Sequence, residues 1–166
     1  NGYKVYGEDG AQVGPEAAEG ITRIIRETAY TDCVLMDEEE AISKGLLKII
    51  GNKEVDDDYI ADVKTLSINP ELLRVEGPKL NIVYSPLHGS GNVPVRRVLK
   101  EIGLTNVAVV KEQEMPDPNF STIKVPNPED PGAYELAFKL AAEVGASVMF
   151  ATDPDCDSLG VAVKDG

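Results

Sequence analysis

The sequence has few cysteines, a deficit of positive charge and no long apolar run, and each of these shortages excludes a class of protein. Cys33 and Cys156 are the only cysteines and lie far apart, so neither a disulfide framework nor a structural zinc site is predicted. Lys and Arg number 16 against 29 Asp and Glu, which gives a net charge of −13. Because no basic block is available to neutralise phosphates or an anionic surface, neither a nucleic-acid partner nor a membrane partner is expected.

No apolar run reaches the roughly 18 residues of a membrane span, and the N-terminus lacks the pattern of a signal peptide. A cytoplasmic location is therefore expected. The 166 residues suffice for one compact domain with a core, with room for extra pieces at either end. Since the chain opens without Met and stops just after a predicted strand, we interpret both ends as cut from something longer.

The first part of the chain predicts one short strand and three helices. The strand covers residues 3–6, and the helices cover residues 14–29, 37–51 and 56–66. Pro15 suits the first turn of the first helix, whereas Gly45 weakens the prediction for the second half of the second helix. Asp56 or Asp57 is the predicted N-cap of the third helix.

From residue 78 onward, strand and helix patterns alternate. The predicted strands cover residues 79–85, 106–110, 146–151 and 159–163, and the predicted helices cover residues 93–103 and 131–145. Asp130 as a cap and Gly145 as a stop frame the last helix, and a long Pro-rich loop precedes it. This alternation predicts an α/β fold, a three-layer α/β/α arrangement with a mainly parallel, mixed sheet.

Three aspartates, Asp153, Asp155 and Asp157, follow directly after a predicted buried strand. In such a sheet, ligands bind beyond the carboxyl ends of the strands. Alternating spacing on an extended backbone would point the three carboxylates one way, where they repel unless a hard cation such as Mg²⁺ or Ca²⁺ joins them. An EF-hand is excluded, because Ser158 and Lys164 stand where that loop needs Gly and Glu. A solvated acidic turn is the alternative.

The Gly-rich turn at residues 85–91 follows a predicted strand and opens a predicted helix, where backbone N–H groups can meet a phosphate. The dinucleotide fingerprint is incomplete, because Pro94 stands where its third glycine should be. A ligand-facing loop and a simple tight turn both stay open. His88 is the only histidine, and since no Ser or Cys partner is evident, no catalytic triad is predicted.

Four motifs in the expected order resemble the α-D-phosphohexomutases, the family that includes phosphoglucomutase and phosphomannomutase. They are NGYK at residues 1–4, SPLHGSG at 85–91, PNPE at 126–129 and DPDCDS at 153–158. The resemblance implies that residues 1–14 end the first mutase domain, residues 15–42 form a connecting helix, and residues 43–166 form the second domain, with the metal loop at 153–158.

The resemblance also implies a chemistry. Such an enzyme interconverts hexose 1-phosphate and 6-phosphate through a phosphoserine and a bisphosphate intermediate, with Mg²⁺ as cofactor. Lys4 would help proton transfer and position the phosphate, and His88 and Ser158 would lie near it. The implied metal ligands are Asp153, Asp155 and Asp157. The implied partners are a phosphosugar substrate and the remaining mutase domains, and this fragment alone is expected to be inactive because the phosphoserine lies outside it.

Ser158 departs from the family pattern, which has Arg at this position. Loss of the guanidinium removes a bidentate phosphate contact. The alternative interpretation is therefore a non-catalytic metal- or nucleotide-binding α/β module, a degenerate mutase. A phosphatase acting from Asp153 is a third interpretation.

Overall fold

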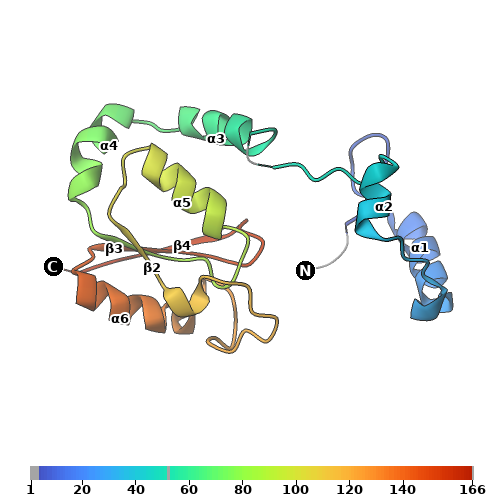
Figure 1. Ribbon diagram of the computed structural model, residues 1–166. Coiled ribbons are helices and arrows are strands. Elements are labelled where there is room, and N and C mark those ends of the chain that lie inside the picture. The colour runs from blue at the N-terminus through green and yellow to red at the C-terminus, as the bar shows by residue number, and fades with distance from the viewer. Residues whose placement is uncertain (1–3, 52, 166) are drawn as a thin grey trace. The chain divides into compact units, whose positions relative to one another are not determined.

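The computed structural model describes residues 4–51 and 53–165 of the chain (Figure 1). The chain divides into two compact units, Asn1–Ile49 and Ile50–Gly166, and each is described by itself. The strand predicted at residues 3–6 begins at Tyr3, which lies outside the described residues.

The first unit has little regular structure beyond two helices. It contains an antiparallel bridge between Tyr6 and Gln12, helix α1 (Pro15–Glu27), a 3₁₀ turn (Tyr30–Asp32) and helix α2 (Glu38–Ser43). Pro15 opens α1 as the sequence predicts. None of the described residues 4–49 is buried, so this unit has no core of its own there.

The second predicted helix is shorter than expected. Helix α2 ends at Ser43 instead of continuing to residue 51, and Gly45 follows with φ of 68°. This left-handed conformation is accessible to glycine and stops the α-helical path. The start of α2 is well capped, because the Asp37 carboxylate accepts a hydrogen bond from the Glu40 backbone N–H at 3.1 Å.

In the residues that the structure describes, the second unit contains four α-helices, three short 3₁₀ helices and a four-stranded sheet. The helices are α3 (Asp56–Thr65), α4 (Pro70–Glu76), α5 (Asn92–Glu101) and α6 (Glu135–Val144). The strands are β1 (Ile82–Ser85), β2 (Val107–Val109), β3 (Val148–Thr152) and β4 (Leu159–Val163). Their order is β2-β1-β3-β4, in which β1 is parallel to β2 and β3, and β4 is antiparallel to β3. The predicted mixed, mainly parallel sheet is confirmed.

Helices cover both faces of this sheet, which gives the predicted three layers (Figure 1). One face packs against α6, where Val83 and Met149 of the strands meet Ala137 and Ala141 of the helix. Small alanine side chains let the helix lie close to the sheet. On the opposite face, α5 lies over the sheet and α3 lies beside α5. All four residues of β1 are buried, as expected for a central strand.

Helix boundaries differ in detail from the sequence predictions. Val55, not Asp56 or Asp57, is the N-cap of α3, and the aspartates lie in its first turn, where negative charge favours the helix. Helix α4 was not predicted, although Asn69 before Pro70 is a typical start, and its amide oxygen accepts the Leu72 N–H at 3.2 Å. The last helix begins as a 3₁₀ turn (Pro131–Tyr134) and continues as α6.

The helices are short throughout the described parts of the chain. The longest there is α1, with 13 residues. No helix within residues 4–51 and 53–165 has the length and apolar character needed to cross a membrane. The cytoplasmic location stays a prediction.

A charged network joins α3 to α5. Arg97 of α5 donates to Asp57 of α3 at 2.6 Å and to Glu101 at 2.8 Å, and Glu101 also accepts from Lys64 of α3 at 2.8 Å. Hydrogen bonds from Lys64 and Arg97 hold the pKa of Glu101 below its usual range. The carboxylate of Glu101 therefore stays ionised in mild acid and links the two helices.

We expect Glu101→Gln to lower the free energy of unfolding at pH 7. Because the folded-state pKa is depressed, the ionised group stabilises the fold above its ordinary pKa of about 4.3, and this contribution is lost as the pH falls through the lowered pKa. The difference in free energy of unfolding between wild type and variant should therefore disappear in acid. Chemical denaturation at several pH values between neutral and acid measures this difference.

Glu71→Gln is the matched control. Glu71 forms an ion pair with Arg74 of its own helix, and their side chains are 78% and 73% exposed. Because water screens such an exposed pair, its loss should change the free energy of unfolding little. A loss of unfolding free energy in Glu101→Gln that does not change with pH would contradict the electrostatic explanation.

Candidate metal centre

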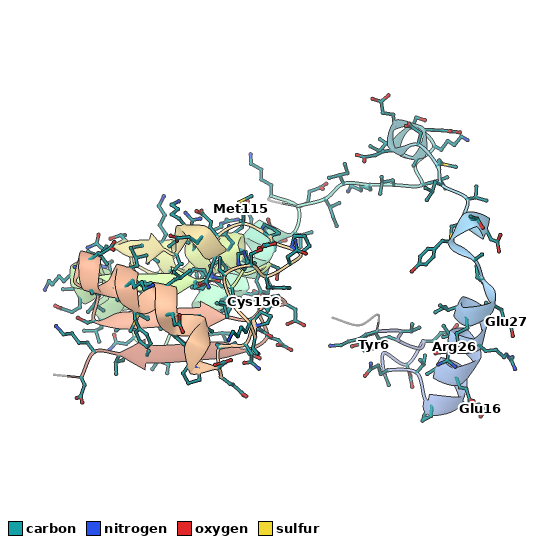
Figure 2. The ribbon with its side chains drawn as sticks, turned by 90° about the horizontal axis from the view of Figure 1, so that it is seen from below. Tyr6, Glu16, Arg26, Glu27, Met115 and Cys156 are labelled. Atoms are coloured by element: carbon teal, nitrogen blue, oxygen red, sulfur yellow. The ribbon has the colours of Figure 1, made fainter. Side chains whose placement is uncertain are left out.

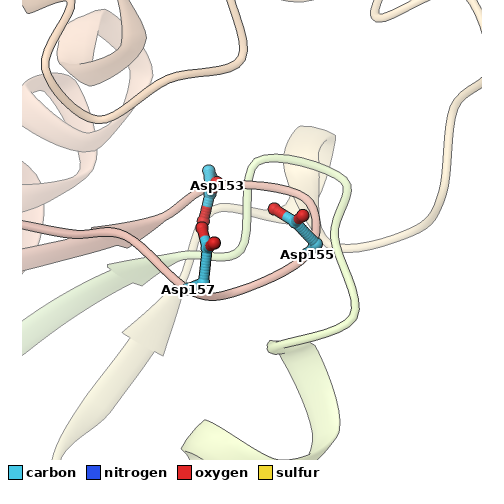
Figure 3. Close-up of side chains that lie close together, drawn as sticks. All are labelled: Asp153, Asp155 and Asp157. Atoms are coloured by element: carbon cyan, nitrogen blue, oxygen red, sulfur yellow. The ribbon is translucent and has the colours of Figure 1, made fainter. Parts of the chain in front are cut away.

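The aspartate loop, residues 153–158, begins where β3 leaves the sheet. Thr152 ends the strand and is buried, Asp153 is half-buried, and Asp155 and Asp157 are exposed. One carboxylate oxygen from each aspartate lies within 4.8 Å of the others. Figure 3 shows the three side chains converging inside the curve of the loop.

This convergence arises from a turn rather than from the extended backbone that the sequence predicts. The Cys156 N–H donates to the Asp153 carbonyl at 3.0 Å, and Cys156 adopts φ of 64°. The Asp153 N–H in turn donates to the Ser158 carbonyl at 3.4 Å, which brings the two ends of the loop together where β4 starts. The alternating spacing was informative, but the geometry behind it is a closed turn.

Asp153 is the anchor of this loop. One of its carboxylate oxygens accepts the Ser158 backbone N–H at 2.9 Å. Partial burial acts to raise the pKa of Asp153, but hydrogen bonding to its carboxylate, first of all from the Ser158 N–H, outweighs burial and lowers the pKa. The Asp153 carboxylate is therefore ionised at neutral pH and fixed in place before any ligand arrives.

The glycine-rich loop, residues 85–91, lies against the aspartate loop. Since β1 and β3 are adjacent and parallel, their carboxyl ends meet at one edge of the sheet. Ser90 donates its backbone N–H to the Pro154 carbonyl at 2.9 Å and its hydroxyl to the same oxygen at 3.1 Å. A Cβ on Gly89 would lie 2.5 Å from the Pro154 Cα, so only glycine permits this contact.

Buried polar groups form the floor of the site. The Tyr84 hydroxyl and the Thr152 hydroxyl are 2.9 Å apart, and burial raises the pKa of Tyr84 to about 12. A Cβ on Gly91 would lie 2.6 Å from the Tyr84 hydroxyl and 2.7 Å from the Cys156 sulfur. The turn of the aspartate loop, the end of β1 and the start of α5 therefore meet at Gly91.

The other predicted site residues lie in different surroundings. Ser158 belongs to the loop, and its hydroxyl donates to Asp157 at 3.2 Å. His88 is 6% exposed, with Nδ1 2.7 Å from the Met115 carbonyl and Nε2 2.8 Å from the Thr122 hydroxyl. Lys4 is exposed and belongs to the first unit. The structure thus brings Ser158 to the aspartates, while the roles of Lys4 and His88 stay predictions.

The donor set fits a hard divalent cation. Carboxylate oxygens are the ligands preferred by Mg²⁺ and Ca²⁺, and two of the three carboxylates are exposed, which leaves room for water and a phosphate oxygen. Within residues 4–51 and 53–165, no Lys or Arg forms an ion pair with any of the three. Their mutual repulsion is thus not offset by a protein cation there.

Several residues that shape the site were not predicted from sequence. Tyr84, Thr152 and Gln113 are buried polar residues at or near the carboxyl ends of strands. A polar residue that ends an apolar strand was the available signal for Thr152. Figure 2 shows Cys156 and Met115, from separate loops, at the same end of this unit.

Comparisons with known proteins identify the family to which the chain belongs. The family described as “Phosphoglucomutase/phosphomannomutase, alpha/beta/alpha domain II” matches residues 57–166. A phosphoglucomutase of Staphylococcus aureus strain MRSA252 is 35% identical over 167 residues, covering 99% of this chain. One from strain N315 is 36% identical over the same length. The chain spans 29% of the length of these relatives.

We expect Gly91→Ala to lower the free energy of unfolding by about 1–3 kcal/mol, because the added methyl overlaps Tyr84 and Cys156 in a packed site. Backbone strain contributes nothing, since Gly91 has φ of −63°. Chemical denaturation followed by far-UV circular dichroism measures the loss. Gly20→Ala is the control: its methyl would meet no atom within 4 Å, so it should not destabilise the chain.

Proposed function

Because the chain belongs to the phosphoglucomutase/phosphomannomutase family, we propose that it carries the metal-binding domain of a phosphosugar mutase. The parent protein interconverts hexose 1-phosphate and hexose 6-phosphate through a phosphoserine and a bisphosphate intermediate. The observation that carries this proposal is the convergence of three aspartates at the carboxyl edge of the sheet, inside the range that matches the family.

The metal ligands in this proposal are Asp153, Asp155 and Asp157. When bound, Mg²⁺ supplies positive charge that neutralises phosphoryl oxygens during transfer. Asp153 is held by the Ser158 N–H, so its oxygen is already oriented, whereas the exposed Asp155 and Asp157 can adjust to the cation. The loop's own contribution is thus to hold three oxygens at short range.

Other residues act on the phosphate and on the proton in this proposal. The Lys4 ammonium positions the phosphoryl group and assists proton transfer at the sugar hydroxyl. His88 and Ser158 lie near the phosphate, and Ser158 offers it only a neutral hydroxyl. Residues 1–14 close the first mutase domain, 15–42 connect, and 43–166 form the second domain. The phosphosugar and the other mutase domains are the partners.

Catalysis requires more than these 166 residues. The chain spans 29% of the length of its relatives, and the proposed phosphoserine belongs to the first mutase domain. We therefore expect no mutase turnover above background from the 166-residue chain alone. Mutase turnover by this chain alone would contradict the proposal that catalysis needs a phosphoserine from another domain.

Metal titration tests the site directly. We expect Mg²⁺ to bind the 166-residue chain weakly, and Asp155→Asn to weaken binding roughly tenfold or more, because an amide oxygen lacks the charge of the carboxylate. Isothermal calorimetry measures both. Asp62→Asn on α3, an exposed aspartate outside the loop, is the matched control and should bind as wild type does.

Absence of binding by the wild-type chain would contradict an independent metal site. The same titration on the longer parent protein then distinguishes two causes. Binding there indicates that the phosphoserine is a required ligand, and no binding there indicates a decayed site.

Ser158 favours one second candidate, a degenerate mutase that binds metal or nucleotide without catalysis. The loop lacks the guanidinium that the family carries at this position, and with it a bidentate phosphate contact. An assay of the parent protein separates the two candidates. Mutase turnover supports the enzyme, whereas turnover that appears only with Ser158→Arg supports the degenerate module.

A further inference from the structure

His88 is buried between two loops, and its partners determine which ring nitrogen carries a proton. Nδ1 lies 2.7 Å from the Met115 carbonyl oxygen. A carbonyl oxygen accepts and cannot donate, so Nδ1 must be protonated. Nε2 lies 2.8 Å from the Thr122 hydroxyl, which can donate to it. The neutral Nδ1–H tautomer satisfies both contacts.

Beyond Thr122, a chain of hydrogen bonds continues through Gln113 and Ser85 to Leu87, and in each of them the donor is the residue farther from His88 along this chain. The Gln113 amide nitrogen donates to the Thr122 hydroxyl at 3.4 Å, and the Gln113 amide oxygen accepts from the Ser85 hydroxyl at 2.6 Å. The Ser85 oxygen accepts the Leu87 N–H at 3.2 Å. Every member therefore donates once toward His88, and no hydroxyl proton is left without an acceptor.

This relay connects the long loop at residues 111–123 with the glycine-rich loop. The His88 backbone N–H donates to the Gln113 carbonyl at 2.9 Å, so His88 is tied to the long loop through both backbone and ring. Leu87 and His88 both adopt positive φ, 46° and 64°. Non-glycine residues hold this conformation only where the surroundings enforce it. The relay supplies that enforcement.

The glycine-rich loop is hydrogen-bonded to the aspartate loop. Two residues after His88, Ser90 donates both its N–H and its hydroxyl to the Pro154 carbonyl. Pro154 lies between Asp153 and Asp155. A shift of the glycine-rich loop therefore moves the backbone from which two of the three carboxylates project.

We propose that His88, with a proton on Nδ1, is a positioning residue that fixes the aspartate loop through the relay of Thr122, Gln113 and Ser85. Its value to catalysis rests on the proposed function, but its effect on the loop does not. His88 then acts on the metal site through the backbone.

The 166-residue chain suits nuclear magnetic resonance because His88 is its only histidine. Ring ¹⁵N chemical shifts should report the Nδ1–H tautomer in the wild type. The Nε2–H tautomer, which has no proton on Nδ1 to donate to the Met115 carbonyl, would overturn the proposal.

Thr122→Val tests the relay without emptying the core. Thr122 is exposed as a residue, so this near-isosteric change removes a hydroxyl and little packing. We expect the amide protons of Ser90 and Cys156 to exchange about fivefold faster, the change that corresponds to loss of one hydrogen bond. Thr122→Ser keeps the hydroxyl and should restore the wild-type rates.

Thr105→Val, an exposed threonine just before β2, is the matched control and should leave both rates unchanged. Equal acceleration of all amides in Thr122→Val would indicate a merely structural role and overturn the proposal, as would unchanged rates at Ser90 and Cys156. Magnesium titration of the wild type judges the proposed function separately, because the exchange rates and the tautomer are measured without metal.

Discussion

The contact between the glycine-rich loop and Pro154 is the constraint on which the site depends. Parallel pairing of β1 with β3, in which Ser85 lies opposite Ala151, brings the two loops to one edge of the sheet. The loops can then touch only because Gly89 and Gly91 carry no side chain. The register of the sheet determines roughly where the aspartates lie, and the close contacts at these two glycines determine their exact position.

Without a cation, repulsion among the three carboxylates destabilises the aspartate loop. The chain carries a net charge of −13, and three carboxylates converge within 4.8 Å with no ion-paired Lys or Arg in the part of the chain that the structure describes. The backbone offsets part of this cost, because the Ser158 N–H stabilises the Asp153 carboxylate. On the proposed function, this arrangement, which gathers like charges and fixes one of them, is suited to a cation.

The sequence was most informative where the determinant is local. The strand before Asp153, the mixed sheet and the capped helix after Asp130 follow from apolar runs and from cap residues, and all are present. Helix α2 ends at Ser43, two residues before Gly45, because the positive φ of this glycine stops the helical path. The sequence pattern identifies the glycine as a weak point but does not determine where the helix ends. The partners of His88 could not be predicted at all, because Met115 and Thr122 lie 27 and 34 residues away along the chain.

Ser158 separates two properties that an arginine there would combine. A guanidinium beside the aspartates would both offset their charge and contact a phosphate. A serine carries no charge and has a single hydroxyl, which donates to Asp157 within the loop. If the proposed function holds, the attraction of the three carboxylates for a cation is therefore undiminished, while recognition of the phosphate loses a donor pair. On the proposed function, this chain should keep its metal site even if phosphate binding has weakened, so metal affinity alone cannot serve as a measure of mutase competence.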